Sequence, residues 1–122
     1  MGIQPQRDLV KRTFEFARRA RGFVNGLPQS PSNFADGRQL LRSSGSVAAN
    51  YLEAQEGLSR RDFFYRIKVC RKEARESELW LHLLDIPTGA IRREHDWLIQ
   101  EIIELKLIFS AIAKKDNSAE ET

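Results

Sequence analysis

Apolar residues recur along the chain at alternating steps of three and four, a spacing that places side chains on one face of an α-helix. The pattern runs through four stretches, and none of them alternates apolar and polar residues as a half-buried strand would. We expect helices roughly over residues 6–27, 31–56, 59–85 and 90–114, followed by a frayed tail over residues 115–122.

The apolar stripe of each stretch predicts which residues form the core. The side chains expected there are Leu9, Thr13, Phe16, Ala20, Phe23 and Leu27 in the first helix, Leu40, Ser44, Val47, Tyr51 and Ala54 in the second, Phe63, Ile67, Cys70, Ala74, Ser77, Leu81 and Leu84 in the third, and Leu98, Ile102, Leu105, Phe109 and Ile112 in the fourth.

Proline, glycine and serine separate the four stretches, at residues 28–33, 57–59 and 85–89. Proline cannot continue a helix, and glycine readily ends one. Ser30 with Pro31 suits a helix start, and Ser59 with Asp62 resembles a capping box. Short connections between long helices favour antiparallel neighbours. The sequence therefore predicts an all-α protein, a single domain over residues 1–122 folded as an antiparallel up-down-up-down four-helix bundle.

The faces that should meet solvent are also partly apolar, in the third and fourth helices above all. A helix that is apolar most of the way round is normally buried on more than one side. We therefore expect a homo-oligomer whose interface uses Tyr65, Leu79, Leu83, Trp97, Ile99, Ile103 and Leu107. The alternative is a thick intramolecular core that reaches these side chains within one chain.

Composition narrows the class of protein. With 122 residues, 41% hydrophobic and 30% charged, the chain suits a soluble globular domain. A single cysteine, Cys70, excludes internal disulfides, and no apolar run approaches the roughly 20 residues that span a bilayer. The first residues have no apolar core of a secretory signal, so we expect a cytoplasmic protein that does not enter a membrane.

Charge is unevenly distributed between the two halves. Residues 1–75 carry 15 basic and 7 acidic side chains, whereas residues 76–122 carry 5 basic and 10 acidic. Either a basic face meets nucleic acid, or the two halves pack together and neutralise each other. Basic and aromatic residues interleave between residues 60 and 75, which favours phosphate contacts. The expected contact residues are Arg60, Arg61, Lys68, Arg71 and Lys72, supported by Arg18, Arg19 and Arg42.

A polar line follows the second helix beside its core stripe. Its members, at steps of four, three, four and three, are Gln39, Ser43, Ser46, Asn50 and Glu53. The serine and glycine residues around this line have low helix propensity, but their small side chains allow another helix to approach closely. This polar seam is either an interaction groove or a hydrogen-bonded edge satisfied by a neighbouring helix.

Patterns that would indicate catalysis are missing. The sequence contains no phosphate-binding glycine loop, no HExxH motif and no Glu-x-x-His pair; Glu78 and His82 are one residue too far apart for the last. Cys70 lies on a core stripe and is most simply a small buried hydrophobe. We expect no metal, no cofactor and no enzymatic activity.

Two stretches of the chain resemble a known family. Residues 39–54, QLLRSSGSVAANYLEA, are similar to the signature of the four-helix-bundle proteins named after the 23S rRNA intervening sequence, and residues 59–63 and 72–81 match the same family. The resemblance implies an antiparallel bundle that assembles into a homo-oligomeric ring, with a pentamer expected. Related accessory proteins of diversity-generating retroelements bind nucleic acid and a reverse transcriptase. The family implies no catalytic residues.

Together these observations predict a cytoplasmic, non-enzymatic, ring-forming bundle that binds RNA or DNA through its basic surface. The alternative is an oligomeric scaffold for a protein partner, which would use the apolar outer faces or the polar seam. A third possibility, an enzyme or small-molecule binder, requires an internal polar pocket.

Overall fold

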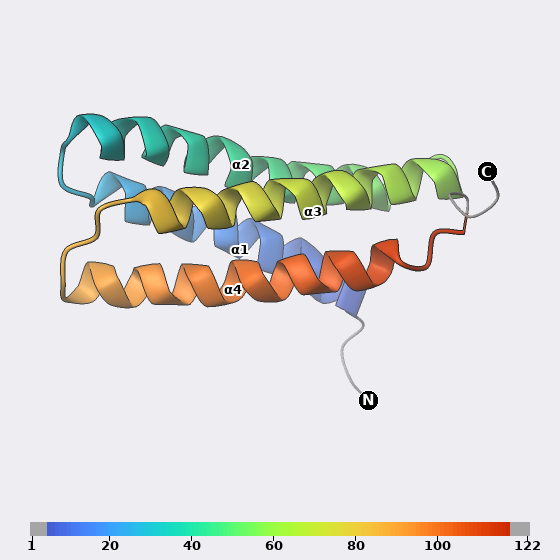
Figure 1. The fold of residues 1–122 in the computed structure, drawn as a ribbon. Coiled ribbons are helices and arrows are strands. Elements are labelled where there is room, and N and C mark those ends of the chain that lie inside the picture. Colours follow the sequence, from blue (N-terminus) through green and yellow to red (C-terminus); the bar gives the residue numbers. More distant parts are fainter. Residues whose placement is uncertain (1–4, 118–122) are drawn as a thin grey trace.

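The computed structural model describes residues 5–117, with side chains from residue 9 onward, and these residues form four α-helices and no strand. The helices are α1 (Pro5–Asn25), α2 (Pro31–Gln55), α3 (Arg60–Leu83) and α4 (Ala90–Ala113) (Figure 1). Their ends lie within two residues of the predicted ones. Most of the tail expected over residues 115–122 lies outside the described residues.

Local chemistry explains where α2, α3 and α4 begin. The hydroxyl of Ser30 accepts a hydrogen bond from the backbone N–H of Asn33, and Ser59 caps α3 in the same way through Asp62, both at 3.0 Å. These bonds satisfy N–H groups that have no partner within the helix. Gly89 precedes α4 with φ at 91°, a backbone conformation that favours glycine. The predicted starts at Ser30 and Ser59 are confirmed.

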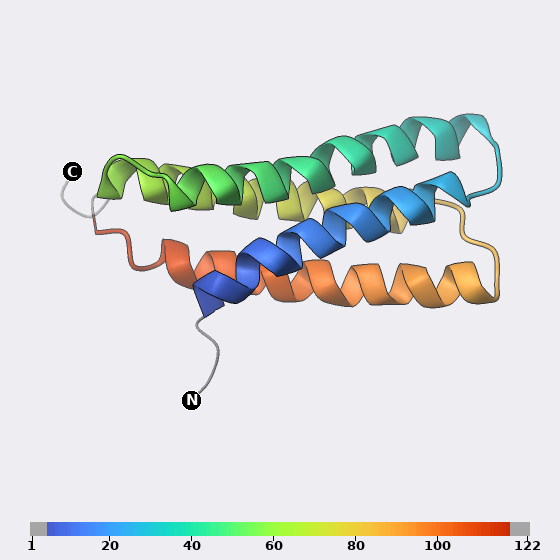
Figure 2. The same ribbon diagram turned by 180° about the vertical axis from the view of Figure 1, so that it is seen from behind.

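The four helices lie side by side as a bundle, in which α1 packs on α2 and α4, and α3 packs on α2 and α4 (Figures 1 and 2). The α1–α2 and α3–α4 loops meet at one end, where the buried side chain of Asn33 donates to the carbonyls of Pro28 and Asp85 and accepts from the Asp85 N–H. At the other end Arg60, beside the α2–α3 loop, donates to the Lys115 carbonyl after α4.

Small residues let α1 approach α2 closely. A Cβ atom added at Gly37 would lie 3.0 Å from a methyl group of Val24, and one added at Gly45 would lie 3.2 Å from the guanidinium of Arg21. Both glycines weaken the helix in isolation by about 1 kcal/mol relative to alanine. The Val24 methyl group explains the glycine at position 37, whereas the guanidinium beside Gly45 is the far end of a flexible side chain, which can move aside for a Cβ atom.

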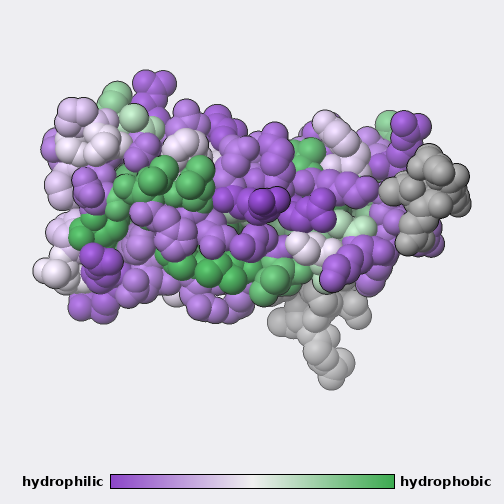
Figure 3. All heavy atoms as spheres, in the orientation of Figure 1, coloured by the Kyte–Doolittle hydropathy of each residue, from purple (hydrophilic) through white to green (hydrophobic). Residues whose placement is uncertain are grey.

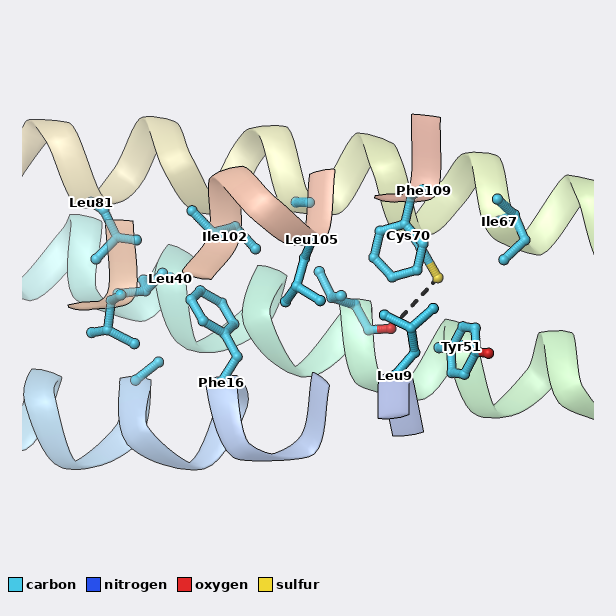
Figure 4. Packing of buried hydrophobic residues seen from close by; sticks show 14 of the residues in the cluster. Leu9, Phe16, Leu40, Tyr51, Ile67, Cys70, Leu81, Ile102, Leu105 and Phe109 are labelled. Atoms are coloured by element: carbon cyan, nitrogen blue, oxygen red, sulfur yellow. Dashed lines mark hydrogen bonds between the residues drawn. The ribbon is translucent and has the colours of Figure 1, made fainter. Parts of the chain in front are cut away.

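The core runs the length of the bundle and is built from the predicted stripes (Figure 4). Every predicted core side chain is buried except Phe63, which is half-buried at the edge of the core, while Phe64 is buried in its place. Spacings of three and four residues both keep a side chain on one helix face, so Phe63 and Phe64 both fit the pattern before Ile67. The structure buries Phe64. The two rings meet edge to face, with centroids 5.2 Å apart.

Candidate nucleic-acid interface

Basic side chains form a row along the outer side of α3. We call Arg61, Lys68, Arg71, Lys72 and Arg75 the α3 basic row. Residues three and four apart are neighbours on a helix surface, so these side chains follow one another along α3. A shallow groove of about 450 Å³ runs beside them. It is lined by Lys68, Arg71, Lys72, Arg75, Glu76 and Leu79.

Several cations of this row have no carboxylate partner among the residues whose side chains the structure describes. Within residues 9–117, Arg61, Arg71 and Arg75 have no carboxylate oxygen within 4 Å. Lys72 is 64% exposed, and its Nζ lies 3.8 Å from an oxygen of Glu73. Unpaired, hydrated cations at these positions can neutralise phosphates without first breaking an internal ion pair.

Two of the predicted contact residues, Lys68 of the row and Arg60 at the start of α3, contact the segment after α4. Lys68 Nζ lies 2.7 Å from the carboxylate of Asp116. The guanidinium of Arg60 donates to the Lys115 carbonyl at 3.0 Å and lies 4.9 Å from the centre of the Phe64 ring. Both side chains therefore already have partners, although both reach the same side of α3 as the rest of the row.

Arg42 belongs to the edge of this surface. Its guanidinium donates to the carboxylates of Glu73, at 3.2 Å, and Glu76, at 2.6 Å. Because Glu76 lines the groove, Arg42 offsets a negative charge that would otherwise repel phosphate there.

The predicted contact residues on α1 lie away from the α3 basic row, because α1 packs between α2 and α4. Arg18 is exposed and, within residues 9–117, has no carboxylate within 4 Å. Arg19 is bound by Glu94, at 2.7 Å, and stacks 3.5 Å from the centre of the Trp97 ring. The hydrogen bonds between them raise the pKa of Arg19 and lower the pKa of Glu94.

The uneven charge along the sequence is partly cancelled between helices. Arg12 of α1 contacts both Glu101 and Glu104 of α4, at 2.9 and 3.0 Å, in the same way as Arg19 contacts Glu94. The acidic fourth helix thus neutralises α1, as one of the two interpretations of the charge pattern expected. The first half of the chain keeps its excess positive charge mainly on α3.

Two residues of the polar seam of α2, Ser43 and Asn50, contact α3. The buried hydroxyl of Ser43 lies 2.7 Å from that of Ser77, and Asn50 accepts a hydrogen bond from Arg66 at 2.9 Å and donates to Ser46. Gln39 is exposed and accepts from Arg42 on its own helix, and Glu53 is exposed. The seam residues therefore do not form one continuous groove.

The predicted oligomer-interface residues fall into two groups. Tyr65, Leu79, Leu83 and Leu107 are 49–61% exposed. Trp97, Ile99 and Ile103 are half-buried, and Arg19 covers the ring of Trp97. Figure 3 shows hydrophobic side chains gathered along α4 and over the C-terminal part of α3, on the face formed by these two helices. One chain alone leaves the apolar side chains of this face partly exposed to solvent.

A second apolar surface, between α1 and α2, was not predicted. A groove of about 260 Å³ is lined by Val10, Lys11, Thr13, Phe14, Ala48 and Leu52. Phe14 is 58% exposed and Leu52 is 55% exposed. The signal was present in the sequence, because Val10, Phe14 and Ala17 form a second stripe with steps of four and three beside the core stripe of α1.

Two side chains with catalytic potential, Cys70 and His95, are buried within the bundle. Burial raises the pKa of the Cys70 thiol to about 12, and its sulfur lies 3.6 Å from the Val47 carbonyl (Figure 4). Nε2 of His95 lies 2.8 Å from the Leu81 carbonyl in the core. In the part of the chain that the structure describes, no three potential metal ligands of the His, Cys, Asp or Glu type come together.

None of the helices α1–α4 is long and apolar enough to cross a membrane. The α3 basic row and the groove beside it form the best candidate for an interaction site, because Arg61, Arg71 and Arg75 have no carboxylate oxygen within 4 Å among residues 9–117.

Comparison with known proteins gives the chain a family. The model of the 23S rRNA-intervening sequence protein family matches residues 6–111. A similar solved structure is that of a protein of unknown function from the S23 ribosomal protein family of Bacteroides thetaiotaomicron VPI-5482. Its sequence is 29% identical to this chain, and the two structures align with a TM-score of 0.80. The alignment covers 92% of this chain and 100% of the Bacteroides chain. No functionally curated protein matches the chain. The chain belongs to the family of 23S rRNA-intervening sequence proteins.

Proposed function

We propose that this chain is a cytoplasmic, non-enzymatic protein, an antiparallel up-down-up-down bundle that assembles into a homo-oligomeric ring and binds nucleic acid through the α3 basic row. The observation that carries the binding function is the set of cations on α3 without a carboxylate partner: Arg61, Arg71 and Arg75 within the described residues. Lys72 adds a largely exposed charge between them.

The neighbouring ion pairs support this assignment. Elsewhere on the bundle, cations such as Arg12 and Arg19 are matched by carboxylates of the facing helix. Arg61, Arg71 and Arg75 of the α3 basic row depart from that pattern and span about 21 Å of helix at 1.5 Å per residue, whereas Lys68 between them is paired with Asp116. Clustered basic side chains of which several have no carboxylate partner are the electrostatic footprint of a phosphate-binding surface.

Two separate apolar faces support assembly. The α1–α2 groove contains Phe14, and the α3–α4 face contains Leu79 and Leu107, all about half exposed or more. Two different faces on one subunit permit a head-to-tail contact, which closes into a ring when the rotation between copies allows it. We propose a pentamer. A ring repeats the basic row once per subunit and so raises the avidity for a long polyanion.

Filter binding across a salt series tests the proposed function. The test variant replaces Arg71, Lys72 and Arg75 with glutamine, and a matched control replaces Lys11, Arg38 and Arg93, which are exposed cations on the other helices. Three lost phosphate contacts should reduce the magnitude of the negative slope of log K against log salt by about 2 to 3 per subunit engaged, since each contact contributes roughly 0.7 to 0.9.

The control variant has the same net charge as the test variant, so it separates a local contact from the overall charge. We expect it to bind nearly as the wild type does. If both variants bound nucleic acid equally weakly, the effect would come from overall charge and not from contacts of the α3 basic row. If the wild type bound no nucleic acid at low salt, the proposed function would be rejected.

An absence of catalysis is supported by the state of the reactive groups. The Cys70 thiol, with a pKa of about 12, stays protonated at neutral pH and lies within the core. A protonated, buried thiol is a poor nucleophile. His95 is buried, and its Nε2 lies 2.8 Å from the Leu81 carbonyl of α3.

A scaffold for a protein partner is the second candidate, and the apolar α1–α2 groove favours it. The polar seam offers little to such a partner, because Ser43, Ser46 and Asn50 are used within the bundle. A pull-down that yields one stoichiometric protein after nuclease treatment, and that Phe14→Arg abolishes, would support this candidate over nucleic-acid binding.

A further inference from the structure

Tyr65 lies on the outer side of α3 among the cations of the basic row. It is one turn after Arg61 and precedes Lys68 and Lys72 by three and seven residues, so it shares their side of the helix. Its side chain is 59% exposed. A tyrosine this exposed contributes little to the core of its own chain.

The Tyr65 ring has support from one neighbour. The guanidinium of Arg66 lies 5.5 Å from its centre, and Arg66 is itself held by the Asn50 side chain at 2.9 Å. The structure gives the Tyr65 hydroxyl no hydrogen-bond partner among the described residues. The ring is therefore presented to solvent beside a fixed cation, and its polar end is not used by the fold.

An exposed aromatic ring in line with cations fits single-stranded nucleic acid. The cations follow the phosphates, and a base that is not paired stacks on the ring. A duplex offers the same phosphates, but its bases are stacked inside the helix and reach a protein ring only after unstacking. The groove beside Lys68, Arg71, Lys72 and Arg75 continues the path of the strand along α3.

We propose that Tyr65 stacks with a base of single-stranded nucleic acid whose backbone follows the α3 basic row, so that the protein prefers single strands to duplexes. This inference rests on the proposed nucleic-acid binding. It also assigns Tyr65 a role other than the contact between copies that the sequence predicted.

The test is fluorescence anisotropy with labelled DNA and RNA of about 20 nucleotides, each single-stranded and as a duplex, at one low salt concentration. The variants are Tyr65→Ala, Tyr65→Phe and Phe34→Ala. Phe34 is the matched control, because it is 62% exposed and has the guanidinium of Arg38 5.7 Å from its ring, but it lies on α2.

We expect Tyr65→Ala to weaken binding of single strands by about 5- to 150-fold, the range found for the loss of one stacked base, and to change duplex binding by less than about twofold. Tyr65→Phe and Phe34→Ala should bind as the wild type does. Light scattering should show the same mass for Tyr65→Ala and the wild type.

Other results would overturn the inference. These are equal weakening for single strands and duplexes, unchanged binding of single strands by Tyr65→Ala, a preference of the wild type for duplexes, or a lower mass of Tyr65→Ala. The failure of the proposed function itself is distinct, because the wild type would then bind neither form at low salt.

Discussion

Ser43 and Ser77 show how single polar residues fix the contact between α2 and α3. Their hydroxyl oxygens lie 2.7 Å apart in a fully buried position. A buried hydroxyl without a hydrogen-bond partner costs about 1–3 kcal/mol. Each of the two serines gives the other such a partner in the core. At this point the polar seam thus helps to fix the position of α3 along α2.

We therefore expect Ser43→Ala and Ser77→Ala each to lower the free energy of unfolding by about 1 kcal/mol, and the double variant to lose clearly less than the sum of the two. Urea denaturation followed by circular dichroism measures all three. Strictly additive losses would mean that the two hydroxyls do not stabilise each other.

The sequence predicted that Ser43 lies beside the core stripe, because periodicity alone fixes the face of a residue. It did not predict Ser77 as its partner, since the pairing depends on how far α3 is shifted along α2. Phe63 and Phe64 show the same limit within one helix. Both positions fit the period, and only packing against the other helices decides which ring is buried.

At the scale of the helices, α1 and α4 make the least extensive of the four main helix contacts and are joined by ion pairs at their margin. Arg19 binds Glu94 with two hydrogen bonds, at 2.7 and 2.9 Å. These bonds lower the pKa of Glu94 below its ordinary value of 4.5. The contribution of this ion pair to stability is therefore fully present at pH values above the pKa of Glu94 in the unfolded chain. It is lost as the pH falls through the lower pKa of Glu94 in the folded protein.

Glu94→Gln should accordingly destabilise the protein by about 0.5–1 kcal/mol near neutral pH, since the pair is partly exposed. The difference from the wild type should shrink as the pH falls below 4.5, the ordinary pKa of a glutamate carboxyl, and should vanish at an acidic pH where the wild-type carboxyl is protonated as well. Thermal unfolding at the two pH values provides the measurement. A gap that persists at the acidic pH would show that the ion pair is not its cause.

Helix boundaries were predictable because their causes are local. Ser30, Ser59 and Gly89 act within a few residues of the backbone they cap or turn. Ion pairs such as those of Arg42 with Glu73 and Glu76 were not predictable, because they join residues more than 30 positions apart. This is why the sequence offered Arg42 as a phosphate contact, whereas the structure shows it engaged with carboxylates of α3.

At the scale of the whole molecule, the surface combines two apolar faces with one basic row. The sequence predicted the α3–α4 face because α4 has no clean polar side, but it did not combine the second stripe of α1 with Ala48 and Leu52 of α2. That combination requires knowing that α1 packs against α2 at this level of the bundle. The proposed ring follows from the two faces taken together.

We expect Leu107→Arg to reduce the assembly to smaller species without loss of helix content, because this side chain is 61% exposed and contributes little to its own core. Leu58→Arg is the matched control, since Leu58 is 97% exposed in the α2–α3 loop and should leave the mass unchanged. Light scattering combined with circular dichroism would reveal both effects. An unchanged mass for Leu107→Arg would remove the α3–α4 face from the interface.

The mass of the wild-type protein in solution at micromolar concentration tests the account most directly, because the repeated basic row depends on assembly. Size-exclusion chromatography with light scattering should give a multiple of the 14.1 kDa subunit mass, with a fivefold multiple for the proposed pentamer. A single species of 14.1 kDa would contradict the account.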